Sequence, residues 1–176
     1  MIIARTIAAA SLLALLPGCM NMGDAPTARA GQGTLTYADG APAGTVQLIE
    51  SGNRLRIAAT VTGAPEGVHG FHLHQTGSCE RPDFKSAGGH LNPEGRDHGT
   101  LDPDGPHLGD LPNMVVAADG TGSIDAMISA DREEALRAIF DTDGTAVVLH
   151  AGPDDYKTDP SGAAGARIAC GVLSPA

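Results

Sequence analysis

Three of the seven histidines of this 176-residue chain lie within six positions, in the stretch HGFHLH at residues 69–74. His72 and His74 alternate with the apolar residues Phe71 and Leu73, and this period of two is typical of a β-strand. Residues i and i+2 of a strand project from the same face, so the two imidazoles would lie side by side. Imidazole is a good ligand for zinc and copper, which makes this strand a candidate metal-binding element.

Further candidate ligands lie far along the chain, in a long segment rich in glycine, proline and aspartate and at the end of a later apolar run. They are His90, His98, His107, Asp110 and His150. A single histidine is more often a surface residue or a hydrogen-bonded core residue than a ligand. The joint pattern favours metal binding, because a carboxylate together with imidazoles completes a zinc site. The spacing alone does not divide these ligands between one metal ion and two.

Short strand-like runs separated by turn signals surround the candidate ligands. The expected strands cover residues 34–38, 45–50, 54–61, 69–74, 114–117, 122–129, 145–150 and 167–172. Many short strands joined by tight turns are typical of an all-β antiparallel sandwich or barrel, here with eight strands. Two long loops, residues 75–112 and 151–166, are unusual in a compact domain, so we expect them to be functional.

One segment has the pattern of a short helix. In DREEALRAIF, residues 131–140, Asp131 could cap the helix, and Leu136, Ile139 and Phe140 could face the core. The sequence suggests no further role for this insertion.

The N-terminus reads as a targeting segment. A basic residue, Arg5, precedes an apolar run that ends in Leu-Pro-Gly before Cys19, which is typical of a secretory signal. The ending resembles the lipobox of bacterial lipoproteins, in which cleavage leaves a lipidated cysteine; an ordinary signal with an incidental cysteine is the alternative. The apolar run is far shorter than the roughly 20 residues that span a bilayer.

We therefore expect three parts: a lipoprotein-type signal peptide at residues 1–18, a flexible tether at 19–33 and one domain at 34–176. Met20 rather than aspartate follows Cys19, which by resemblance to bacterial sorting rules favours the outer membrane. The expected location is the periplasmic side of that membrane, with the lipid as the only membrane contact.

The charge and the cysteines limit the partners. A formal net charge of −10, with no basic run, makes the chain a poor nucleic-acid binder. With Cys19 assigned to lipid, Cys79 and Cys170 remain, and two cysteines in an exported chain most simply form a disulfide.

Five segments together resemble the copper,zinc superoxide dismutases of the exported bacterial branch. They are GFHLH, SAGGHLNP, RDHGTLDPDGPHLGDLP, HAGPDDY and GARIACGV, in the family's order. The resemblance implies an eight-stranded Greek-key barrel, one copper and one zinc ion per chain, and the dismutation of superoxide to O2 and H2O2. The alternatives are a copper-binding or metal-delivery protein on the same barrel, and a zinc hydrolase, for which the chain lacks an H-E-x-x-H motif with its general base. A homodimer is left open.

The resemblance also implies a role for each site residue. Copper would be bound by His72, His74, His90 and His150. Zinc would be bound by His90, His98, His107 and Asp110. His90 would bridge the two metals and carry a proton between the half-reactions. Asp154 would hold a copper-ligand and a zinc-ligand histidine at once, whereas His69 would be structural.

Outside the ligands, the resemblance implies that Cys79 and Cys170 form the family's disulfide. Arg167 would dock the superoxide anion beside the copper through two donors of its guanidinium. Lys85 and Lys157 are further candidates for attracting the substrate.

Overall fold

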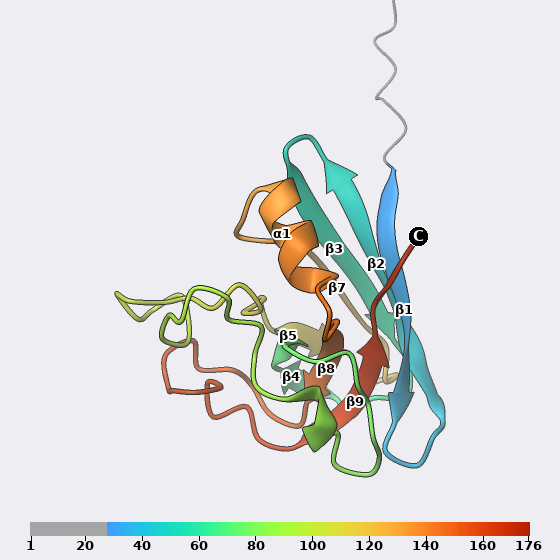
Figure 1. Ribbon diagram of the computed structural model, residues 1–176. Helices are drawn as coiled ribbons and strands as arrows, with labels where there is room; N and C mark the ends of the chain where they lie inside the picture. Colours follow the sequence, from blue (N-terminus) through green and yellow to red (C-terminus); the bar gives the residue numbers. More distant parts are fainter. Residues whose placement is uncertain (1–27) are drawn as a thin grey trace, which may run out of the picture.

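The computed structural model describes residues 28–176 (Figure 1). The expected signal peptide, Cys19 and most of the expected tether lie outside these residues. The strands are β1 (Arg29–Tyr37), β2 (Pro42–Ser51), β3 (Arg54–Val61), β4 (Gly67–His69), β5 (Phe71–His74), β6 (Met114–Val116), β7 (Gly122–Met127), β8 (Ala146–His150), β9 (Arg167–Val172) and β10 (Ser174–Pro175). The helices are a 3-10 turn, η1 (Lys85–Ala87), and α1 (Arg132–Ile139).

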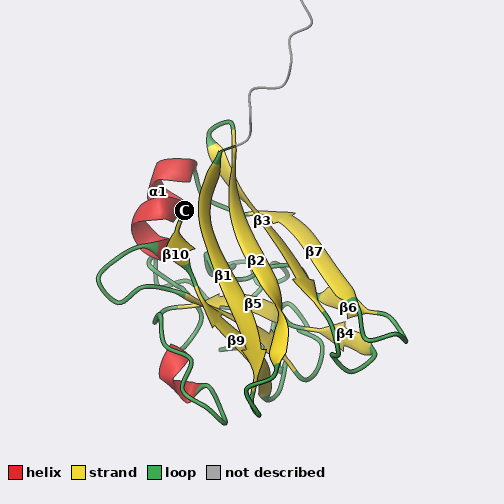
Figure 2. Ribbon diagram, turned by 90° about the vertical axis from the view of Figure 1, so that its right-hand side faces the viewer, coloured by secondary structure: helices red, strands yellow, loops and turns green. Residues whose placement is uncertain are grey.

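All the strands belong to one antiparallel sheet (Figure 2). Its order is β4-β6-β7-β3-β2-β1-β9-β8-β5, with β10 paired to β1. The two ends of this order, β4 and β5, are consecutive in the chain and are separated only by Gly70. The sheet therefore rolls into a nearly closed barrel, which confirms the all-β fold with one short helix and two long loops.

Residues 28–176 form ten strands rather than the expected eight. The expected strand at 69–74 is divided at Gly70, whose N–H donates to the carbonyl of Gly152 and whose carbonyl accepts from the N–H of His150, both at 2.8 Å. At this residue the chain leaves its pairing with β6 and begins to pair with β8. The other additional strand is the two-residue β10.

The barrel begins earlier than expected. Residues 29–33 lie in β1 and not in the expected tether. Part of the low apolar content of this segment is explained by packing, because two of its residues leave no room for a side chain. A Cβ on Gly31 would lie 2.7 Å from Cζ of Phe140, and one on Gly33 would lie 2.7 Å from the carbonyl oxygen of Val172. These glycines are places of close approach within the sheet.

The core fills the barrel interior. Among its completely buried residues are Leu35, Leu48, Ile57, Phe71 and Leu149. Burial of each such side chain contributes about 1.5–3 kcal/mol to folding.

Helix α1 packs against this core with Ala135 and Ile139 fully buried and Leu136 and Phe140 partly buried. Asp131 caps the helix as expected, accepting a hydrogen bond from the N–H of Glu134 at 3.1 Å. Within the described residues no helix is long and apolar enough to cross a membrane.

Candidate metal centre

Strand β5 places two histidines on one face, as the alternation predicts. Phe71 and Leu73 belong to the barrel core, so His72 and His74 point to the opposite face. That face is also buried, because the long loop covers it. The N–H of Leu73 donates to the carbonyl of Gly109 at 3.0 Å, and the N–H of Leu91 donates to the carbonyl of Leu73 at 2.8 Å.

The first ligand group combines residues from three parts of the chain. Donor atoms of His72, His74, His90 and His150 lie within 4.8 Å of one another. Nε2 of His74 and Nε2 of His150 are 3.4 Å apart. Nitrogens that share one metal at bond lengths of about 2.0–2.1 Å in a tetrahedral arrangement are about 3.3 Å apart. This spacing suits a metal ion between the two rings.

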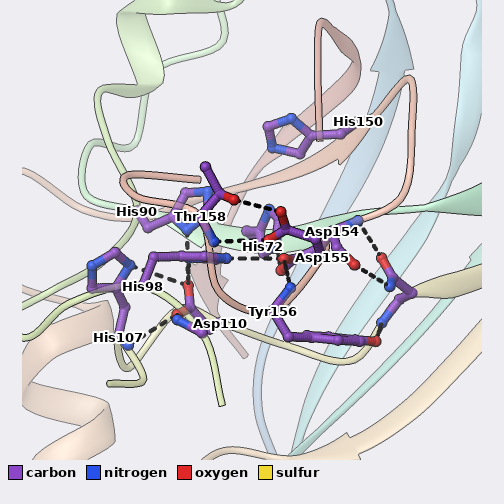
Figure 3. Close-up of polar contacts among 12 residues, drawn as sticks. His72, His90, His98, His107, Asp110, His150, Asp154, Asp155, Tyr156 and Thr158 are labelled. Atoms are coloured by element: carbon purple, nitrogen blue, oxygen red, sulfur yellow. Dashed lines mark hydrogen bonds and ion pairs between the residues drawn. The ribbon is translucent and has the colours of Figure 1, made fainter. Parts of the chain in front are cut away.

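The second ligand group surrounds Asp110. Nδ1 of His90, His98 and His107 lie 2.8, 3.0 and 3.2 Å from Oδ1 of Asp110. Figure 3 shows these four side chains together. Three imidazoles and one carboxylate are a typical zinc donor set.

His90 belongs to both groups. Its Nδ1 faces Asp110, while its Nε2 is buried without a hydrogen-bond partner. Nδ1 of His72 is likewise buried with no hydrogen-bond partner. An unpartnered buried polar atom is costly, and coordination of a metal would remove that cost. The residues therefore fit two metal ions that share His90.

The second ring nitrogens of His72 and His98 have a partner that fixes the orientation of both rings. Nε2 of His72 and Nε2 of His98 donate to the two carboxylate oxygens of Asp154, at 2.8 and 2.9 Å. The side chain of Asp154 is completely buried. One carboxylate thus connects a residue of each ligand group, the position in which such a partner aligns and tunes ligands.

Backbone carbonyls orient the other two rings of the first group. Nδ1 of His74 donates to the carbonyl of Gly88 at 3.0 Å, and Nδ1 of His150 donates to the carbonyl of Gly165 at 3.2 Å. The sequence did not reveal Gly88 and Gly165 as orienting groups, because every residue carries a carbonyl and residue type gives no signal of its direction.

The electrostatics keep most of the ligands ready to bind a cation. Burial lowers the pKa of His74 to about 2 and the pKa values of His90 and His150 to about 4. These three rings are neutral near pH 7 and keep a lone pair for a metal.

His98 is different. Burial lowers its pKa, but hydrogen bonds to Asp110 and Asp154 outweigh that effect and raise the pKa to about 9. Burial opposes ionisation of Asp110 and Asp154, yet hydrogen bonds from the histidines hold the pKa of both carboxyl groups below the usual range. Both aspartates are therefore ionised near pH 7. In the metal-free protein the His98 ring is protonated on both nitrogens at that pH.

Arg167 lies at the edge of the first group. It pairs in register with His150 at the start of β9. Its guanidinium donates to the carbonyls of Phe84 and Gly88, both at 2.6 Å. Since the carbonyl of Gly88 also accepts from His74, one backbone group fixes both the arginine and a candidate copper ligand.

An open pocket next to this arginine is lined by Asp83, Lys85, Gly165 and Arg167, among others. Lys85 is highly exposed and pairs with Asp83 at 2.9 Å. Arg167, held by two carbonyls, is the fixed positive charge at this mouth.

The two predicted disulfide cysteines and His69 lie close to the site. Cys79 and Cys170 form the expected disulfide, with their Cα atoms 5.7 Å apart, and it ties the long loop to β9. His69 belongs to neither ligand group. Its ring nitrogens lie 2.8 Å from the carbonyl oxygen of His150 and 2.9 Å from that of Pro65.

Known proteins resemble this chain in sequence. The family model for copper/zinc superoxide dismutase (SODC) matches residues 42–173. "Superoxide dismutase [Cu-Zn] 2" of Aquifex aeolicus is 42% identical over 143 residues, which cover 79% of this chain and 83% of that protein. The chain therefore belongs to the copper/zinc superoxide dismutase family. It is an oxidoreductase with copper and zinc as its cofactors.

Two solved structures support the same conclusion. A SOD-like protein from Bacillus subtilis superposes with a TM-score of 0.76 at 39% identity, covering 84% of this chain and 100% of the other. The Cu/Zn superoxide dismutase from Brucella abortus superposes with a TM-score of 0.66 at 30% identity, covering 81% of this chain and 98% of the other.

Proposed function

We propose that this enzyme dismutates superoxide to O2 and H2O2 at a copper ion held by His72, His74, His90 and His150. His90 also joins this site to a zinc ion held with His98, His107 and Asp110. The observation that carries the proposal is the position of His90, whose two ring nitrogens face two different ligand groups. The copper site is the centre of turnover, and the zinc site gives it its geometry, because zinc has no redox chemistry.

Copper, when bound, supplies the redox couple that takes an electron from one superoxide and gives it to a second, which with two protons becomes H2O2. The chain relays one of those protons. Nε2 of His90 would take up a proton from water in the first half-reaction and give it to the second superoxide in the second half-reaction. Asp110 keeps the opposite side of the same ring oriented.

Arg167 docks the substrate. Two of its five N–H donors are used by the carbonyls of Phe84 and Gly88, which leaves others for an anion. The two carbonyls hold the guanidinium in one orientation, so a superoxide anion would meet a preformed positive group beside the copper ligands.

Metal analysis together with a superoxide-consumption assay tests the proposal. A protein that holds one copper and one zinc and consumes superoxide supports it. A protein that holds copper without consuming superoxide supports the second candidate, a copper-binding or metal-delivery protein on the same barrel. The observation that favours this candidate is the likeness to a Bacillus subtilis protein described only as SOD-like.

We also propose that the enzyme is exported and lipid-anchored through Cys19 on the periplasmic side of the outer membrane. The signal-like residues 1–18 and Met20 support this location. Wild-type protein should fractionate with membranes, and Cys19→Ser should be released or left unprocessed. An unmodified, freely soluble wild-type protein would contradict the anchor.

A homodimer is a further proposal. Val68 on β4 and Val115 on β6 are opposite one another in register and are 43% and 66% exposed. This apolar pair is the supporting observation on the described surface. Sedimentation at micromolar concentration tests it, and a monomer there would contradict it.

A further inference from the structure

The side chain of Asn113 pairs with the backbone of Asp154 as a neighbouring strand would. Its Nδ2 donates to the carbonyl of Asp154, and its Oδ1 accepts from the N–H of Asp154, both at 2.9 Å. Asn113 directly precedes β6, whereas Asp154 lies in the loop at 151–166. The two hydrogen bonds therefore fasten that loop to the barrel at the residue whose carboxylate bonds to one histidine of each ligand group.

Tyr156 closes the same network from the other side. Its hydroxyl accepts from the N–H of Asn113 at 2.8 Å, and its own N–H donates to Oδ1 of Asp154 at 2.6 Å. Figure 3 shows Tyr156 lying beside Asp154 with its ring turned away from the histidines.

The backbone of Tyr156 is unusual. Its φ of 63° is in the left-handed region, which a bulky residue rarely adopts. Such a conformation persists only where the surroundings hold it, and it is concentrated at functional sites. Here the left-handed turn aims the N–H of Tyr156 at the carboxylate while its hydroxyl reaches Asn113.

We propose that Asn113 and Tyr156 are positioning residues that set the carboxylate of Asp154 between His72 and His98. The assignment of those histidines to copper and zinc rests on the proposed function. The positioning of Asp154 depends only on hydrogen bonds within the chain and not on which metals are bound. Asp154 must satisfy two rings at once, and its loop has no regular structure to fix it, so a small displacement would break one of the two bonds. The clamp formed by Asn113 and Tyr156 prevents that displacement.

The variants Asn113→Ala and Tyr156→Phe test the clamp. Asn113→Ala removes both bonds to the backbone of Asp154, and Tyr156→Phe removes only the acceptor for the N–H of Asn113. Asn92→Ala is the matched control. Asn92 makes the same kind of two-bond pairing with the backbone of Arg96, at 2.8 and 3.0 Å, but it makes none with Asp154.

Two measurements do not depend on dismutase activity. In the metal-free protein, proton NMR follows the Nε2–H signals of His72 and His98, which Asp154 protects from exchange. Chelator competition gives the zinc affinity. We expect Asn113→Ala to speed the exchange of both signals and to lower zinc affinity by about 10–100-fold, the usual effect of losing a partner of metal ligands. Tyr156→Phe should change both in the same direction by less, and Asn92→Ala should change neither.

A third measurement concerns copper. At full copper and zinc content, Asn113→Ala should change the Cu(II) EPR spectrum, because His72 is no longer held by a fixed Asp154. The proposal is overturned if folded Asn113→Ala matches Asn92→Ala in all three measurements. If Asn113→Ala does not fold, Tyr156→Phe decides in the same way. The NMR and zinc results stand even if the protein proves to be no dismutase, so failure of the clamp and failure of the proposed function are distinguishable.

Discussion

At the level of single residues, the raised pKa of His98 leads to a prediction about zinc binding. Its pKa of about 9 means that it carries two protons near pH 7, although burial acts in the opposite direction. Its Nδ1 lies 3.0 Å from Asp110, on the side where zinc would bind, so zinc must displace a proton there. We expect about one proton to be released per zinc bound near neutral pH, and progressively less as the pH rises through 9. Calorimetry in buffers of different ionisation enthalpy measures this number. A value near zero at neutral pH would contradict the assignment.

Two ligand substitutions separate the roles of the sites. His150→Ala removes a proposed ligand of copper alone and should abolish activity. Asp110→Ala should weaken zinc retention and leave partial activity. It also removes the acceptor for the N–H groups of Gly99 and His107, so the ligand loop itself loosens. Metal content and superoxide consumption are measured on the same samples. Equal and complete loss of copper in both variants would argue against the division of roles.

Arg167 should affect the rate without affecting metal content. Arg167→Glu reverses the one fixed charge at the pocket mouth, and local fields of this kind change association rates by roughly 10–10³-fold. We expect a rate constant lower by about one to two orders of magnitude, and an intermediate value for Arg167→Lys, which keeps the charge but loses the planar donor pair. Wild-type activity should fall as ionic strength rises. A metal-replete Arg167→Glu enzyme with unchanged rate would place the attraction elsewhere, with Lys85 or Lys157 the next candidate.

At the level of elements, the sequence predicts best where the signal is local. The alternation in 69–74 predicts which side chains of β5 face the core, and the capping pattern predicts α1. The start of β1 is missed because Gly31 and Gly33 are small for reasons that lie in Phe140 and Val172, far along the chain.

The site shows the same limit. Residue types identified the histidines as candidate ligands, and the resemblance to a family divided them between two metals and added Asp154 and Arg167. Asn113 and Tyr156 were not found, because an asparagine and a tyrosine in loops have many uses. Their role depends on hydrogen bonds between side chains and backbone across more than forty positions, as in the contacts of Asn113 with Asp154 at a separation of 41 and with Tyr156 at a separation of 43.

The disulfide between the long loop and β9 helps to hold Arg167 in place. It closes a separation of 91 residues, for which the chain-entropy model gives about 4–5 kcal/mol of stabilisation. It also fastens the loop whose carbonyls at Phe84 and Gly88 hold the arginine. We expect the Cys79→Ser/Cys170→Ser variant to lose stability by up to that amount in urea unfolding, and to lose rate even when fully metal-loaded. Unchanged stability and rate would show that the loop is held by its other contacts.

At the level of the whole molecule, the proposed substrate is an anion, while the chain itself has a formal net charge of −10. These facts are compatible because salt screens exposed charges beyond about 8 Å at physiological ionic strength. The field at the pocket mouth, where Arg167 is fixed and Lys85 is paired with Asp83, therefore matters more than the total. The barrel provides the rigid part of this arrangement, and the two long loops provide most of the groups that surround the metals.

The most direct test of the account is superoxide decay followed after a radiolytic pulse, with the protein in three states: copper and zinc bound, zinc bound alone, and metal-free. The account predicts fast decay, first order in protein, for the state with both metals, and no acceleration above background for the other two. A protein shown by metal analysis to hold one copper and one zinc, and that nevertheless leaves superoxide decay at the background rate, would contradict it.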